Sequence, residues 1–123
     1  MPTDKPAKPE RWQARTANDP ILRLTIPADA GRERRFETSV LLNVRAGDSA
    51  TRPHHALKVY ADGELQWQRR IPTARGEARG ESWDGLEWRA ALAVPVGRPL
   101  VLQAEAKLEG ARLLELRIEA DEI

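Results

Sequence analysis

The sequence contains no cysteine, and only six of its 123 residues are aromatic: four Trp, one Tyr and one Phe. Without thiols the chain cannot form a disulfide scaffold, a thiolate zinc site, an iron–sulfur cluster or a cysteine nucleophile. A domain of this length buries roughly two thirds of the surface that its unfolded chain exposes, so it does not need such a crosslink. We therefore expect one domain held together by its hydrophobic core.

The chain also lacks an excess of either charge. Its 20 Lys plus Arg residues nearly balance 19 Asp plus Glu, giving a net charge of +1, and this gives no reason to expect nucleic acid or an anionic membrane as partner. No apolar run approaches the roughly 20 residues that span a bilayer. Residues 1–19 lack the apolar stretch of a secretory signal, so the expected location is the cytoplasm.

Motifs of common catalytic or cofactor sites are missing as well. Ser82 lacks the second glycine of a G-x-S-x-G elbow, and no glycine-rich phosphate loop occurs. The neighbouring His54 and His55 point to opposite sides of an extended chain, so we interpret them as surface imidazoles and not as a metal pair. The sequence predicts no catalytic residue, no metal and no cofactor.

The composition changes near residue 20. Residues 1–19 carry three prolines, charges of both signs and a single large apolar side chain, Trp12, and are predicted to form a flexible arm. From Pro20 onward apolar residues fall on alternate positions, which is typical of strands with one buried face. We expect a folded domain over residues 20–123, with seven strands at 22–26, 36–44, 57–59, 65–71, 86–94, 100–106 and 114–118.

Gly63 predicts the form of the turn after strand 57–59. A three-residue loop over 61–63, with Gly63 left-handed in a bulge, places Val59 opposite Leu65. A two-residue turn would place Val59 opposite Gln66 and mix apolar with polar side chains. The hydrophobic pattern therefore favours the three-residue loop.

Gly110 predicts a second hairpin of the same kind, between strands 100–106 and 114–118. The alternative is a helix, because this region is rich in helix formers. A helix would place Glu105 and Glu109 in the apolar stripe, whereas alternation separates them from the leucines. We prefer the hairpin.

Seven short strands and no obligatory helix predict an all-β fold. The expected architecture is a seven-stranded antiparallel β-sandwich of immunoglobulin-like or fibronectin-III-like type, with the flexible N-terminal arm. The cysteine pair and the tyrosine that mark antibody domains are missing, so the expectation concerns architecture and not ancestry.

The segment from Pro72 to Gly85 is the main candidate for binding, because a connection of this length is often a binding loop. Trp83 is a candidate stacking platform for a sugar ring or an anchor for a protein, with polar contacts from Arg79, Glu81 or Asp84. The alternative is that Trp83 folds back over the sandwich edge.

The other tryptophans divide between the arm and the strands. Trp12 is a candidate anchor for another chain, or it packs on its own domain. Trp67 and Trp88 share the inward pattern of their strands and are expected in the core, while Tyr60 points outward.

We interpret the chain as a non-catalytic interaction module, a subunit or accessory domain. Its protein partner is expected at the arm around Trp12, at the loop 72–85 or at an unpaired sheet edge. The alternative is a carbohydrate- or small-ligand-binding module centred on Trp83. A hydrolase that uses loop carboxylates is a third hypothesis.

Overall fold

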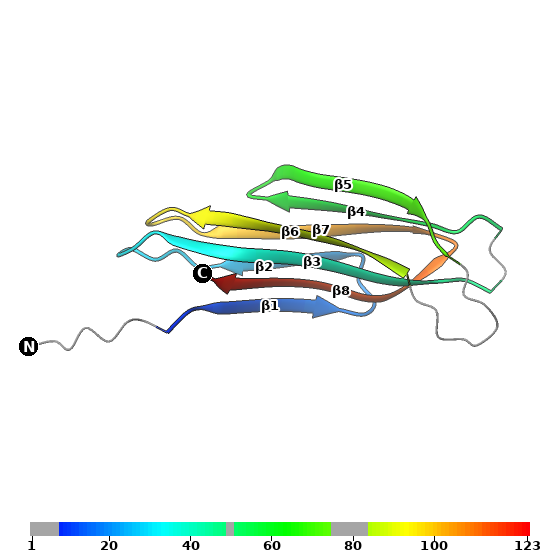
Figure 1. Cartoon of the computed structure of the whole chain (residues 1–123), viewed down its shortest axis with the longest axis horizontal. Coiled ribbons are helices and arrows are strands. Elements are labelled where there is room, and N and C mark those ends of the chain that lie inside the picture. Colours follow the sequence, from blue (N-terminus) through cyan, green and yellow to red (C-terminus); the bar gives the residue numbers. More distant parts are fainter. Residues whose placement is uncertain (1–7, 49–50, 75–83) are drawn as a thin grey trace, which may run out of the picture.

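Two antiparallel sheets of four strands each make up the fold (Figure 1). The computed structural model describes residues 8–48, 51–74 and 84–123. Within these ranges no helix occurs, and so none that could cross a membrane. The strands are β1 (Arg11–Thr16), β2 (Ile21–Ile26), β3 (Arg34–Ala46), β4 (His54–Ala61), β5 (Glu64–Pro72), β6 (Asp84–Val94), β7 (Leu100–Glu109) and β8 (Ala111–Glu122).

The strand order leaves two edges on each sheet. The first sheet, sheet A, has the order β1-β8-β3-β6, and the second, sheet B, has the order β2-β7-β4-β5. Figure 1 shows β5 at one side of the molecule and β1 at the opposite side. Consecutive strands often lie in different sheets, so the chain crosses repeatedly between the two layers.

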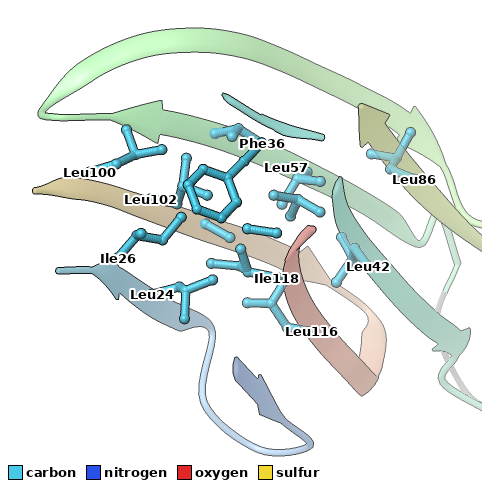
Figure 2. Packing of buried hydrophobic residues seen from close by; sticks show 14 of the residues in the cluster. Leu24, Ile26, Phe36, Leu42, Leu57, Leu86, Leu100, Leu102, Leu116 and Ile118 are labelled. Atoms are coloured by element: carbon cyan, nitrogen blue, oxygen red, sulfur yellow. The ribbon is translucent and has the colours of Figure 1, made fainter. Parts of the chain in front are cut away.

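The core lies between the sheets and is built by alternate residues of the central strands. Along β3, buried residues alternate with exposed or half-buried ones from Arg34 to Val44, as expected for a strand with one face inward. Figure 2 shows Phe36 and Leu42 of β3 in the same interior as Leu57 of β4 and Leu102 of β7. These four side chains are completely buried. The two-layered all-β architecture expected from the alternation is therefore confirmed.

The expected count of seven strands is wrong, because the structure has an eighth. All seven predicted segments form strands, but residues 11–16, assigned above to a flexible arm, form β1. Trp12 and Ala14 face the core from β1, while Arg11 pairs with Asp121 on β8. Burial of Trp12 provides the free energy that orders this segment. The prolines and charges around it led to the prediction of a flexible arm. Residues 1–7 of the predicted arm lie outside the described residues.

The β4–β5 hairpin has a different turn from the one predicted. Asp62 and Gly63 both have positive φ, 49° and 82°, and Ala61 pairs with Glu64, which makes a two-residue turn. The register then shifts between Val59 and Tyr60, so that Val59 lies opposite Trp67 and not opposite Leu65. The extra residue that the hydrophobic pattern requires is thus accommodated in the strand, and the predicted bulge at the turn is wrong.

The predicted hairpin between the last two strands is also wrong. Gly110 is left-handed as expected, with φ of 67°. However, β7 pairs with β2 and β4 in sheet B, whereas β8 pairs with β1 and β3 in sheet A. Alternation predicts which side chains face the core. In both β7 and β8 alternate apolar residues do face it, although the two strands lie in opposite sheets. Alternation does not predict the partner of a strand.

Candidate docking surface

Two of the five predicted site residues lie in the described part of the chain. Trp12 is half-buried against the core, and its Nε1 donates a hydrogen bond of 3.1 Å to Glu10 Oε1. Of its two predicted alternatives, the structure shows packing on its own domain. Arg79, Glu81 and Trp83 lie outside the described residues, so their predicted contacts stay predictions.

Asp84, the other described site residue, closes the base of the loop 72–85. It is the first residue of β6, and its Oδ2 accepts a hydrogen bond of 2.9 Å from the backbone N–H of Ala74. Its Oδ1 accepts a second, of 2.8 Å, from the N–H of Gly85. Because both carboxylate oxygens are engaged by backbone, the geometry gives Asp84 a structural role at this position.

His55 lies beside this loop base and is not the surface imidazole that the sequence suggested. Its side chain is completely buried, and its Nδ1 lies 2.7 Å from Thr73 Oγ1. Burial lowers the pKa of His55, and the nearby Asp84 carboxylate opposes this shift only in part. His54 points to the opposite side of β4 and is half-exposed, so the two rings do not share a site.

A charged cluster at one end of the sandwich joins both ends of the described chain. Arg34 has a buried side chain, and its Nη1 lies 2.6 Å from Glu10 Oε1. Arg32 contacts Glu10 at 3.0 Å and Glu122 at 2.6 Å. The hydrogen bond from Arg32 lowers the pKa of the Glu122 carboxyl. Because its arginines and carboxylates contact one another, we call this cluster a clamp on the fold. Arg34 Nε has no hydrogen-bond partner among the described residues, and a hollow of about 440 Å³ lies over Arg32, Arg34, Arg35 and Glu122.

Ion pairs also neutralise the outer face of sheet A across its middle. Four arginines, each on β1, β8 or β6, lie within ion-pair distance of carboxylates on the same face. The pairs are Arg11–Asp121 and Arg15–Glu115 at 3.1 Å, Arg89–Glu87 at 2.6 Å, and Arg117 with Glu115 and Glu119 at 3.3 Å. This pattern is typical of a solvated face, with little free charge for a partner.

The outer face of sheet B differs in charge and in shape. It carries four basic side chains, Arg23, Lys58, Arg70 and Lys107, against two acidic ones, Glu105 and Glu109. No ion pair among the described residues includes Lys58 or Lys107, and Arg23 hydrogen-bonds to the neutral Gln103. We call this surface the docking face, with Ile21, Ala56, Lys58, Leu65, Arg70 and Lys107 as its main residues.

The docking face is hollowed at Ala56. Three adjoining hollows share the small Ala56 side chain and Lys107, and the two larger ones each have a volume of about 330 Å³. One of these extends to Pro20 and Ile21 on β2, and the other to Gln68 and Arg70 on β5. A short side chain between long ones leaves the depression, so the hollow follows directly from the identity of residue 56.

Exposed apolar side chains lie at both margins of the docking face. Ile21 on β2 is 51% exposed and Leu65 on β5 is 46% exposed. The bulge next to Tyr60 turns Leu65 outward, opposite Tyr60, so the expected pairing of Leu65 with the buried Val59 is wrong. The alternation in the sequence does not show that Leu65 lies on the surface, because it does not reveal the bulge.

The β5 edge continues the docking face. Among the described strands β5 pairs with β4 alone, so one side of its backbone has no strand partner there. Trp67 and Ile71 point inward from β5 but are only half-buried, and the same holds for Trp88 on edge strand β6. The expected inward direction of both tryptophans is confirmed, and their partial burial reflects their place on edge strands.

Comparisons with known proteins support the fold alone. No protein-family profile and no curated protein matches the chain. Among solved structures, the crystal structure of dimeric latent PorU from Porphyromonas gingivalis is similar over 89% of this chain, with a TM-score of 0.54 and 11% sequence identity. This chain spans 11% of that protein's length. The similarity supports the two-sheet all-β architecture and says nothing of function.

Proposed function

We propose that this chain is a non-catalytic β-sandwich interaction module, a subunit or accessory domain that binds another protein. The contact surface is the docking face together with the β5 edge that continues it. Of the three surfaces expected from the sequence, the sheet edge is the one that the described residues support. The cytoplasmic location and the relation to immunoglobulin-like or fibronectin-III-like sandwiches stay predictions.

The contrast between the two outer faces carries this proposal. The middle of sheet A is neutralised by its own ion pairs, so a partner there would have to replace contacts that already exist. The docking face has exposed Ile21 and Leu65, lysines without ion pairs to the described residues and a hollow at Ala56. Exposed apolar side chains rimmed by polar ones are typical of protein-binding surfaces.

Affinity capture with matched variants tests the proposal. The full chain serves as bait in an extract of its source organism at physiological salt, and retained proteins are identified by mass spectrometry. Leu65→Arg places a charge on the docking face. Leu114→Arg is the matched control, because Leu114 is 42% exposed but lies on β8 in sheet A.

The two variants give opposite expectations. A protein retained by the wild type and by Leu114→Arg, and lost with Leu65→Arg, supports the proposal. Equal retention by both variants, or no specific retention at all, contradicts it. Circular dichroism of each variant confirms that the fold is intact, which is expected because both side chains are exposed.

The two other hypotheses depend on residues outside the described ranges. A carbohydrate module centred on Trp83 predicts saturable quenching of tryptophan fluorescence by an oligosaccharide, lost in Trp83→Ala. A hydrolase that uses loop carboxylates predicts turnover that survives purification to homogeneity. No described contact favours either one over protein binding.

A further inference from the structure

The Ala56 hollow is flanked by positive charge on three sides. Lys107 on β7 and Arg70 on β5 lie directly opposite Ala56 in the two adjoining strands, and Lys58 follows two positions along β4. Side chains directly opposite in a sheet have Cβ atoms about 4.5–5.5 Å apart, and diagonal neighbours lie about 7–8 Å apart. A group bound over Ala56 is therefore within reach of all three cations.

Two of these cations have no carboxylate partner among the described residues. Arg70 Nη2 lies 3.1 Å from Glu109 Oε2, whereas no ion pair includes Lys58 or Lys107. Glu105 lies directly opposite Lys58, but its Oε1 accepts a hydrogen bond of 2.9 Å from Gln103 Nε2. The cations Lys58, Arg69, Arg70 and Lys107 that line the hollow outnumber its carboxylates, Glu105 and Glu109, so the hollow has an excess of positive charge.

We infer that the Ala56 hollow binds acidic side chains of an extended polypeptide segment of the partner, with Lys58 and Lys107 as the carboxylate ligands. This inference rests on the proposed function, because it names the chemistry of the segment that the docking face binds. Its support is charge complementarity, since a surface with free lysines selects and attracts an acidic partner.

The apolar part of the hollow fits a polypeptide that carries acidic and apolar side chains on the same side. Pro20, Ile21 and Ala106 line the side of the hollow that faces β2, next to the lysines. An extended chain turns side chains i and i+2 to the same side, so a segment with an acidic and an apolar residue two positions apart presents both kinds to the face. Apolar contact then adds to a charge interaction that salt would otherwise weaken.

Nucleic acid fits this surface less well. Its phosphates carry a continuous negative charge, which would meet Glu105 and Glu109 on the same face as the lysines. Single strands also need several aromatic side chains for stacking, and Tyr60 is the one aromatic that the described part of this face presents. Discrete carboxylates on a peptide can avoid both acidic residues.

Chemical-shift mapping with synthetic probes tests the inference. The ¹⁵N-labelled full chain is titrated with an acetylated decapeptide of alternating Glu-Glu and Val-Val pairs, which carries both kinds of side chain on each side. Controls are the same peptide with Gln in place of Glu, and the oligonucleotide decathymidylate. We expect saturable amide shifts centred on Ala56, Lys58 and Lys107 with the acidic peptide only, and weaker binding when salt is raised from about 50 to about 200 mM.

Charge variants supply the quantitative part of the test. The double variant Lys58→Glu/Lys107→Glu is expected to lose at least about tenfold in affinity for the acidic peptide. Arg98→Glu/Arg112→Glu changes the net charge equally at exposed positions outside the docking face, and should keep wild-type affinity. Glu105→Gln removes an acidic neighbour and should raise the affinity about threefold.

Each contrary result has a definite meaning. Equal binding of the Glu and Gln peptides, decathymidylate binding as tightly as the acidic peptide, or equal losses in the two double variants would overturn the inference. If the acidic peptide fails to bind while Leu65→Arg still abolishes capture of a protein, the inference is wrong and the proposed function stands. If the peptide binds as expected but Leu65→Arg leaves capture unchanged, the carboxylate site stands and the proposed function fails.

Discussion

At the scale of single residues, burial decides how His55 responds to pH. Its lowered pKa means that, between that value and the ordinary 6.5, the folded chain holds fewer protons than the unfolded chain. The free energy of unfolding is therefore highest above a pH of about 6.5 and falls as the pH drops toward the native pKa. In this window the slope contributed by His55 is positive, because the unfolded chain binds the proton that the buried ring does not.

Urea unfolding between about pH 7.5 and about pH 5 checks this expectation. We predict that His55→Gln is less stable than the wild type at the upper end of this range but has a flatter pH dependence. The control, His54→Gln, changes the half-exposed neighbour and should keep the wild-type slope. A His55→Gln variant with the same slope as the wild type would show that another group causes the pH dependence.

Arg34 is the second residue whose environment sets a clear expectation. Its buried guanidinium contacts Glu10 and the Pro27 carbonyl, and lies 5.6 Å from the centre of the Phe36 ring. Arg34→Met leaves both oxygens without this donor, and should cost about 3 kcal/mol of stability. Arg35→Met changes the exposed neighbour on β3 and should cost much less. Similar midpoints for the two variants in chemical unfolding would contradict the structural role of the clamp.

At the scale of elements, two glycines test the arrangement of the edge strands. Gly63 has φ of +82°, and the space that a Cβ would occupy there is open, so Gly63→Ala should cost only the left-handed backbone strain of about 1–2 kcal/mol. A Cβ on Gly85 of β6 would lie 2.3 Å from the backbone oxygen of Leu42 on β3. Gly85→Ala should therefore cost at least about 3 kcal/mol, because backbone must move.

Thermal unfolding of the two alanine variants compares these costs directly. The β3–β6 pairing predicts a clearly lower midpoint for Gly85→Ala than for Gly63→Ala. Equal midpoints would mean that β6 does not approach β3 as closely at this position as the structure shows.

The sequence predicted the elements better than their connections. Alternation located β2 to β8, because period two records which side chains face the core. It missed β1, where Trp12 and Ala14 lie among prolines and charges, and it paired β7 with β8, because alternation is the same for a hairpin and for strands in opposite sheets. The turn at Gly63 was predicted wrongly for a related reason, since a two-residue turn with a bulge in β5 also brings Trp67 and Ile71 to the inward side, while Leu65 turns outward.

Little of the docking face could be predicted from the sequence. Ala56, Lys58 and Lys107 come from two strands and meet only through the β4–β7 register. Leu65 reaches the surface only because of the bulge. The sequence drew attention to Trp12 and Asp84, whose side chains the structure uses in packing and in closing a loop base.

At the scale of the whole molecule, the two outer faces have different roles. Sheet A carries opposite charges side by side across its middle, with Leu114 exposed on β8, whereas sheet B presents lysines without described ion pairs, a hollow at Ala56 and the exposed Ile21 and Leu65. β5 extends sheet B at one side of the molecule (Figure 1). The account depends on this asymmetry, because a partner gains more from covering apolar side chains and free charge than from replacing existing ion pairs.

Hydroxyl-radical footprinting of the free chain and of its complex with the captured partner tests the asymmetry most directly. Mass spectrometry then compares the oxidation of side chains on the two faces. The account predicts that Ile21, Tyr60 and Leu65 are protected in the complex, while the exposed Leu114 on sheet A is oxidised as in the free chain. Protection of Leu114 with unchanged oxidation of Ile21 and Leu65 would contradict it.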